Sequence, residues 1–310
     1  MRSVMVVFAI AMVVAALPVT AQKRTPLRTP WGDPDLQGLW PVVDLLSVPI
    51  ERPEELGTRA TLTDEEFARL PSESRTPGPN DFFTGVGTRA LLQEFGKPQR
   101  QTSLIVDPPD GRLPPLTAEG EKRAAALPTT NGPRNGPEDF SPMERCISRG
   151  VLGSMVPLGS SNGNQIIQAA GWVVILNEMV HEARVIPIDG RPHVGSKIRS
   201  YMGDSRGRWE GQTLVVETVN FNDNSNFIGG AGTRIPSYSR DARLTERFSR
   251  IDADTIRYEA TVDDPTTWTR PWTIAFSLKR DLGYPLFEYA CHEENFSMPH
   301  MLRGKRAEEN

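Results

Sequence analysis

Beyond residue 21 the sequence has no hydrophobic run long enough to cross a bilayer, which takes roughly 20 apolar residues. A membrane span is therefore not expected there. The sequence also lacks any concentration of basic charge, because 35 Lys and Arg residues are scattered among 39 Asp and Glu residues, for a formal net charge of −4. Without a basic patch, neither a nucleic acid nor another polyanion is expected as a partner.

The motifs of several enzyme classes are missing as well. The four histidines show neither a His-x-His nor a His-Glu-x-x-His spacing. Gly150-Val151-Leu152-Gly153 lacks the Lys-Ser/Thr that follows in a phosphate-binding loop. Gly203-Asp204-Ser205-Arg206-Gly207 is interpreted as a polar turn between strands. The sequence therefore gives little support to nucleophilic or nucleotide-dependent chemistry.

The first 21 residues have the features of a cleavable signal peptide. Arg2 is basic, Val4 to Leu17 carry no charge, and Ala21 is a small residue at the expected cut. A retained membrane anchor is the alternative, but the apolar run is shorter than a span requires. We expect the mature chain to begin at Gln22 and to be periplasmic or secreted.

Cysteine is scarce, since Cys146 and Cys291 are the only two. In an exported chain an even number of cysteines pairs most simply as a disulfide. The bridge would attach the segment around Cys146 to the C-terminal strands. Free thiols or metal ligands are the alternative, which an oxidising compartment disfavours.

Proline and glycine, 27 and 26 residues respectively, interrupt the chain most densely between residues 22 and 160. Long helices and strands are not expected in that stretch, which we interpret as an irregular N-terminal arm. Two short helices are predicted within it, over 62–70 and 116–126. Thr63 and Thr117 are their expected N-caps, and Glu66 would complete a capping box with Thr63.

Alternation of apolar and polar residues with a period of two runs from about Asn164 to Cys291. It predicts nine strands within residues 161–298, followed by a tail over 299–310. The expected fold is all-β, an antiparallel up-and-down, lipocalin-like barrel of about eight or nine strands, because such a barrel hides its edge strands. The predicted strands are Gln165–Ala169, Trp172–Glu178, His181–Ile188, Lys197–Met202, Thr213–Phe221, Arg243–Ile251, Thr255–Val262, Trp272–Lys279 and Leu286–Cys291.

Three motifs resemble those of a set of uncharacterised exported bacterial proteins. The resemblance covers most of the mature chain and implies export, but it implies no catalytic residue. The strand pattern is similar to calycin barrels of the lipocalin type at the level of fold, which by itself implies no function. The motifs are Trp31-Gly32-Asp33-Pro34-Asp35-Leu36-Gln37-Gly38-Leu39-Trp40, Gly207-Arg208-Trp209-Glu210-Gly211-Gln212-Thr213-Leu214-Val215-Val216-Glu217-Thr218 and Tyr289-Ala290-Cys291-His292-Glu293.

Two histidines precede glutamates, as His181-Glu182 and His292-Glu293. If the two pairs converged, they could hold a divalent metal with an open position for water. Against this, His181 and Glu182 would point to opposite faces of a strand. We therefore expect no cofactor, and a divalent metal is the alternative.

Two glutamates, Glu217 and Glu246, lie between apolar residues two positions away along their predicted strands. We interpret them as carboxylates that face a common interior, where burial would raise the pKa as a general acid requires. The alternative is that each pairs with an arginine on a neighbouring strand, such as Arg184 or Arg257.

Tyr258 and Trp272 lie in rows of apolar residues on single strand faces. Such rows build either a packed core or the wall of a pocket. We predict a small-molecule-binding barrel for a partly apolar ligand, which Arg184, Glu217, Tyr258 and Trp272 would contact.

Two other functions compete with binding. One is a hydrolase or lyase that uses His181, Glu246 and His292 as catalytic residues, with or without a metal. The other is an envelope-interaction module in which the N-terminal arm is the binding surface.

Overall fold

The computed structural model describes residues 27–72, 94–127, 135–224, 235–293 and 296–308. The predicted signal peptide, its cleavage site and Gln22 lie outside these ranges. Within them, no helix is long and apolar enough to cross a membrane.

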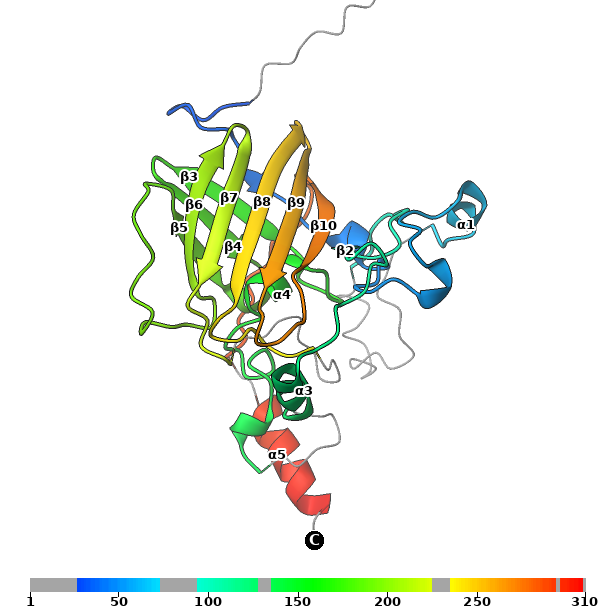
Figure 1. The fold of residues 1–310 in the computed structure, drawn as a ribbon, viewed down its shortest axis with the longest axis vertical. Helices are drawn as coiled ribbons and strands as arrows, with labels where there is room; N and C mark the ends of the chain where they lie inside the picture. Colours follow the sequence, from blue (N-terminus) through cyan, green and yellow to red (C-terminus); the bar gives the residue numbers. More distant parts are fainter. Residues whose placement is uncertain (1–26, 73–93, 128–134, 225–234, 294–295, 309–310) are drawn as a thin grey trace, which may run out of the picture.

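The described strands form two antiparallel sheets (Figure 1). The smaller sheet has the order β1-β3-β4-β5, and the larger sheet has the order β2-β10-β9-β8-β7-β6. The chain is therefore mostly β, as predicted, but the described strands show no closed barrel. The strands are β1 (Gly38–Leu39), β2 (Ile105–Asp107), β3 (Asn164–Ala169), β4 (Trp172–Asn177), β5 (Ala183–Pro187), β6 (Asp204–Glu210), β7 (Thr213–Val219), β8 (Arg243–Asp252), β9 (Thr255–Asp263) and β10 (Trp272–Lys279).

The helices are short, and most of them lie at the periphery of the two stacked sheets. The two predicted helices are present with the predicted caps: Thr63 Oγ1 accepts from the Glu66 N–H at 3.2 Å, and Thr117 Oγ1 accepts from the Gly120 N–H at 3.0 Å. The helices are α1 (Asp64–Ala68), α3 (Ala118–Ala125), α4 (Val151–Met155), α5 (Ser297–Glu308) and the single turns η1 (Val43–Leu45), η2 (Glu54–Leu56), η3 (Pro137–Asp139) and η4 (Met179–His181).

The N-terminal arm is bound to both sheets. Its strand β1 pairs with β3 at the edge of the smaller sheet, and its strand β2 pairs with β10 at the edge of the larger sheet. The predicted disulfide between Cys146 and Cys291 is present, with Cα atoms 5.7 Å apart. The arm therefore completes the sheets, although its proline and glycine content suggested only irregular chain.

One turn prediction and two strand predictions are wrong. Gly203–Gly207, interpreted as a turn, belongs largely to β6, which pairs with β7 along its whole length. Lys197–Met202 forms no strand and contributes only the parallel bridge between Ser200 and Phe221. Leu286–Cys291 is an irregular segment without strand pairing. The alternation that predicted the last two strands has no partner strand to satisfy its backbone hydrogen bonds.

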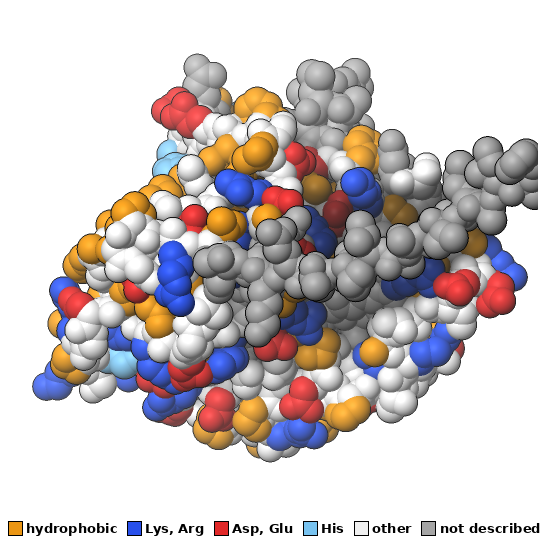
Figure 2. All heavy atoms as spheres, turned by 90° about the horizontal axis from the view of Figure 1, so that it is seen from above, with side chains coloured by type: hydrophobic (Ala, Val, Ile, Leu, Met, Phe, Trp, Pro, Cys, Tyr) orange, Lys and Arg blue, Asp and Glu red, His pale blue; other side chains and the backbone are white. Residues whose placement is uncertain are grey.

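The two sheets are stacked with their inner faces together, and β6 to β10 lie in front of β3 to β5 in Figure 1. Side chains from both sheets share one hydrophobic core, and α4 packs at the lower end of it, where all five of its residues are buried. Seen from above, side chains of both charges mix with hydrophobic ones on the surface (Figure 2). The loops at the α4 end of the sandwich carry most of the polar clusters described below.

Candidate functional site

An ion pair joins the two sheets inside the sandwich. Arg184 of β5 faces Glu246 of β8, and both side chains are at most 5% exposed. Arg184 Nη2 donates to Glu246 Oε1 at 2.9 Å, Nη1 donates to Oε2, and the Tyr258 hydroxyl donates to Oε1 at 3.0 Å. The alternative that Glu246 pairs with an arginine is therefore confirmed. This carboxylate is not free to act as an acid or base on a substrate.

Glu217 lies on the outer face of the larger sheet. The register pairs Glu246 with Val216, so the next residue of β7 points to the opposite face. The Glu217 carboxylate is 28% exposed and pairs with Arg243. The prediction that Glu217 and Glu246 face a common interior is wrong, because the two side chains lie on opposite faces of the larger sheet. The sequence pattern was misleading at Val215, which is apolar and buried although it lies on the outer face with Glu217.

Tyr258 and Trp272, predicted to contact a ligand, are fully buried. The Tyr258 ring packs against Phe248 and Phe276 with centroid separations of 4.9 and 5.0 Å. Trp272 packs edge-on against Trp268 at 5.5 Å. In the structure these aromatic rows build the packed core between the sheets.

His181 lies in the turn just before β5, where the backbone is strained. Val180 and His181 have φ of 64° and 42°, and a β-branched residue such as valine rarely adopts this left-handed conformation. The exposed imidazole donates from Nδ1 to the Tyr289 carbonyl at 2.6 Å. Because Nδ1 is used in this bond, Nε2 is the ring nitrogen that can contact another group. Strain of this kind gathers at functional sites.

His292 and Glu293 follow Cys291 directly, and both side chains are exposed. The disulfide to Cys146 holds them at the same end of the sandwich as His181. Nevertheless, the described ranges contain no group of three or more His, Cys, Asp or Glu residues placed to hold a metal ion. Convergence of the two His-Glu pairs on a metal is therefore not supported.

Glu182 turns toward the segment that precedes α4. Ser148 Oγ donates to Glu182 Oε2 at 2.8 Å, and the backbone N–H of Arg149 also donates to this carboxylate. Burial raises the pKa of Glu182, although these two bonds and the charge of Arg184 lower it. A half-buried carboxyl with a raised pKa is suited to proton transfer.

Arg149 is a buried cation with few bonds. Its side chain is 2% exposed, Nη2 donates to the Val156 carbonyl at 3.4 Å, and Nε has no hydrogen-bond partner in the part of the chain that the structure describes. Burial lowers the pKa of Arg149 to about 10, and nearby Tyr289 opposes this shift. No ion pair to an Asp or Glu is found for Arg149 among the described residues.

Two other arginines in the described ranges, Arg52 and Arg184, are buried to the same degree. Arg52 donates to two side-chain hydroxyls and two backbone carbonyls at 2.7 to 3.3 Å. Arg184 has the carboxylate of Glu246. Burying a charge costs several kcal/mol unless a partner compensates for it. Arg149 is therefore the buried arginine whose position needs an explanation other than packing.

Residues 281–291, here called the covering segment, form no helix or strand, and one of them, Tyr289, interacts electrostatically with Arg149. Tyr289 in this segment is half-buried. Burial raises the pKa of its phenol, although the Arg149 charge lowers it, so the hydroxyl stays protonated at neutral pH. Together these residues form what we call the Arg149 cluster: Ser148, Arg149, His181, Glu182 and Tyr289.

Side chains attach the covering segment to the smaller sheet. The Tyr284 hydroxyl lies 2.7 Å from Glu178 Oε2 and 2.7 Å from Glu94 Oε1, and the Phe287 N–H donates to Glu178 Oε1 at 3.1 Å. Burial raises the pKa of Tyr284. With the disulfide and the bond from His181, these contacts determine where the segment lies over the cluster.

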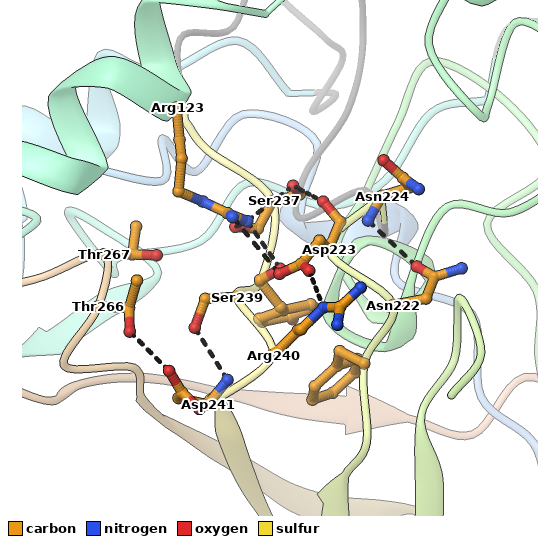
Figure 3. Close-up of polar contacts among 12 residues, drawn as sticks. Arg123, Asn222, Asp223, Asn224, Ser237, Ser239, Arg240, Asp241, Thr266 and Thr267 are labelled. Carbon is orange, nitrogen blue, oxygen red and sulfur yellow. Dashed lines mark hydrogen bonds and ion pairs between the residues drawn. The ribbon is translucent and has the colours of Figure 1, made fainter. Parts of the chain in front are cut away.

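A second polar cluster lies where α3 meets the connections after β7 and β9 (Figure 3). Arg123 of α3 donates from Nη2 to the carbonyls of Ser237 and Tyr238 at 3.0 and 2.9 Å, and Asp223 pairs with Arg240. The charges of these described side chains pair with one another. This cluster therefore attaches α3 to the sandwich and does not offer an obvious charge to a ligand.

One serine motif lies outside the sites predicted from the sequence. Gly159-Ser160-Ser161-Asn162-Gly163 matches Gly-x-Ser-x-Gly, and Ser161 has φ of 58°. However, the turn leads into β3 and does not connect a strand to a following helix, as a nucleophile elbow does. The Ser161 N–H donates to Glu94 Oε1 at 2.8 Å. The motif therefore forms part of the attachment around Tyr284.

Sequence reasoning named His181 and Glu182 but missed Ser148 and Arg149. A signal was available, because Arg149 is three residues from Cys146, and Tyr289 is two residues from Cys291. A disulfide between those cysteines implies that the neighbouring side chains meet. No pattern in the sequence indicated that the guanidinium would be buried without an acid.

No protein-family profile, curated protein or solved structure matches this chain. The function is therefore inferred from the geometry of the Arg149 cluster.

Proposed function

We propose that the protein is exported and binds a small, partly apolar molecule that carries an anionic group, with Arg149 pairing with that group. The buried guanidinium supports this proposal, since among the described residues it makes one long hydrogen bond and its Nε finds no acceptor. A carboxylate, phosphate or sulfate group would supply the missing charge and accept from Nε and Nη. Binding would offset the cost of burying Arg149.

The surroundings of Arg149 suit the rest of such a molecule. The protonated Tyr289 hydroxyl can donate to the anion beside the guanidinium. Phe287, two residues before Tyr289 in the chain, is 68% exposed and supplies the covering segment with an exposed apolar side chain. Entry requires the covering segment to move around Tyr289, which breaks the bond from His181 to the Tyr289 carbonyl but no helix or strand pairing. A closed barrel is not needed for this mode of binding.

Export is part of the proposal and is supported by two features. The predicted signal peptide precedes the described residues, and the Cys146–Cys291 disulfide is of the kind that persists in oxidising compartments. Fractionation of cells that express the whole chain tests this directly. Recovery of the shortened chain from the periplasm or medium is expected, and recovery of the uncut chain from the cytoplasm would contradict it.

The binding test uses benzoate, acetate and inorganic phosphate as probes. Benzoate is expected to raise the melting temperature of the wild type more than acetate does, because its ring adds apolar contact. The Arg149→Met variant is expected to lose the response to all three, and Arg191→Met, an exposed control, is expected to keep it. Equal responses of the wild type and Arg149→Met would show that the anions bind elsewhere.

A second candidate function is a hydrolase or lyase that acts on the same bound molecule. The observation that favours it is the adjacent pair of an oriented imidazole, His181, and a carboxyl with raised pKa, Glu182. A carboxyl whose pKa is raised by burial is suited to proton transfer, and a hydrogen bond that orients an imidazole ring positions it for the same task. A panel of carboxylate and phosphate esters tests it. Turnover that is lost in both His181→Ala and Glu182→Gln supports catalysis, whereas turnover that survives both substitutions excludes this pair.

A further inference from the structure

The outer face of the smaller sheet is uncharged. Its outward positions on β3, β4 and β5 are apolar except for Gln165, since the register aligns Ile167, Val174 and Val185 in one row across the strands. Val185 is 56% exposed and Ile167 is 43% exposed. We call this surface the apolar face and define it by six residues: Ile167, Ala169, Trp172, Val174, Leu176 and Val185.

The outer face of the larger sheet is different. A comparable row across its strands contains three charged residues, Arg208, Arg247 and Glu259. The side chain of each is more than 40% exposed. An antiparallel sheet with one wet face normally alternates apolar inward and polar outward residues. The larger sheet follows this rule and the smaller sheet does not. The apolar face is therefore not an ordinary solvent-facing surface.

We propose that the apolar face binds the apolar face of a second copy of this chain. Charge decides the occupant, because stacking this face on the larger sheet of another copy would bury arginines against valine and isoleucine without partners. Stacking it on itself brings together uncharged side chains of β3, β4 and β5. A contact between identical faces is isologous, so it closes at two copies and does not extend into a filament.

The rim of the face supports this arrangement. Arg191, in the turn after β5, places its guanidinium 4.8 Å from the centroid of the Trp172 ring and pairs with Asp189. Both charged side chains lie at the end of the sheet and remain partly exposed. An apolar centre with a polar, solvated rim is the usual composition of a protein interface.

The size of the face sets the expected strength. Three strands of five or six residues present a surface of roughly 15 Å by 20 Å. This is less than the ~800 Å² that each partner contributes to a standard interface. We therefore expect a dimer in reversible equilibrium with the monomer, with a dissociation constant on the order of micromolar.

Sedimentation equilibrium of the mature chain from 1 to 200 μM, given as an order-of-magnitude range, tests the proposal. The wild type should pass from monomer to dimer. Val185→Lys and Ile167→Lys should weaken dimerisation by about tenfold or more, because each would place like charges together in the contact. The control is Thr245→Lys at an outward position of β8 in the larger sheet, and it should dimerise as the wild type does.

Circular dichroism establishes that each variant is folded, and two exposed positions are used so that the failure of one does not end the test. A wild type that stays monomeric throughout the range overturns the proposal. A dimer that neither lysine variant weakens overturns it also. Binding of the wild type to phosphatidylcholine vesicles, lost in both variants and without any dimer, would show that lipid covers the face and a second copy does not.

Discussion

Arg184 and Glu246 belong to different sheets, and their side chains form a two-bond ion pair in the interior, with Nη2 2.9 Å from Oε1. The pair is the polar contact that connects β5 to β8 through the core. Its position means that the register of each sheet must be correct before the pair can form. A buried pair of this kind adds little net stability, but the loss of one partner leaves the other charge buried and uncompensated.

The first prediction concerns this asymmetry. Glu246→Gln should lower the free energy of unfolding by about 3–5 kcal/mol, because Arg184 stays buried without a counter-ion. Glu217→Gln is the matched control, since Glu217 contacts Arg243 and His193 on the outer face of the larger sheet, where solvent screens the charges, and the substitution should cost only about 0–1 kcal/mol. Urea denaturation followed by tryptophan fluorescence measures both. Similar losses at the two positions would contradict the structure.

The double variant Arg184→Met, Glu246→Leu distinguishes the net contribution of the ion pair from the cost of leaving one of its charges without a partner. Removing both charges leaves apolar side chains of similar volume between the sheets, so most of the stability lost in Glu246→Gln should return. The Tyr258 hydroxyl then loses its acceptor, which should cost about 1–3 kcal/mol. A double variant that is less stable than Glu246→Gln would show that the ion pair itself stabilises the fold.

The second prediction compares Arg149 and Arg52, two buried arginines that pair with no carboxylate among the described residues. Arg149→Met should leave the free energy of unfolding unchanged or raise it by about 1–3 kcal/mol, because it removes a poorly compensated charge. Arg52→Met should lower it by about 2–4 kcal/mol, because four acceptors lose their donor. Thermal unfolding in a buffer without oxyanions checks this. Equal destabilisation would mean that Arg149 is a structural residue.

Features that depend on short stretches of sequence agree with the structure. The cap at Thr63, the alternation in β8 to β10 and the pairing of Cys146 with Cys291 all depend on residues near in sequence or on scarcity of cysteine. They were therefore predictable. β1 was not, because a strand of two residues is made by the partner strand that it joins.

The candidate site was harder to predict because it depends on Arg149 having no acidic partner among the described residues, and no local sequence pattern reports this. Alternation placed Glu217 in the interior since Val215 looked like a core residue, whereas only the register with β8 shows which face is inward. Arg149 lies in a segment without periodicity, and its lack of an acid partner among the described residues depends on parts of the chain far from it in sequence. His181 was found from its type, but the strained turn that orients it has no signature in the sequence.

The third prediction concerns the disulfide. Cys146→Ser with Cys291→Ser should lower the free energy of unfolding by about 2–5 kcal/mol, because the bridge closes a loop of 145 residues in the unfolded chain. Addition of a reductant to the wild type should have the same effect and should not change the double variant. If the reductant lowers the melting temperature of both proteins equally, the effect does not come from this bridge.

The disulfide variant also tests the attachment of the covering segment. With the bridge absent, the bond from His181 to the Tyr289 carbonyl should form less often, so hydrogen exchange across residues 284–293 should speed up. Exchange in β8 and β9 should change little, because these strands lie in the middle of the larger sheet. A uniform increase throughout the chain would indicate global loosening and would remove the specific role of the bridge.

The fourth prediction concerns pH and Glu182. Because burial raises the pKa of this carboxyl above 4.5, the folded chain holds its proton more tightly than the unfolded chain does. The stability that this proton contributes is fully present below pH 4.5 and is lost as the pH rises through the raised pKa of the folded chain. Glu182→Gln has no such proton to lose, and its amide oxygen can still accept from Ser148.

As the pH rises from 4.5 toward neutrality, the wild type should lose free energy of unfolding relative to Glu182→Gln, so the variant should become the more stable of the two by a growing margin. Urea titrations at several pH values measure the difference. Glu119→Gln on the surface of α3 is the control and should follow the wild type. If the Glu182 variant instead falls behind the wild type as the pH rises, the ionised carboxylate is the stabilising form. Glu182 would then be a structural anion for Ser148 and the Arg149 backbone, and proton transfer at the cluster would lose its support.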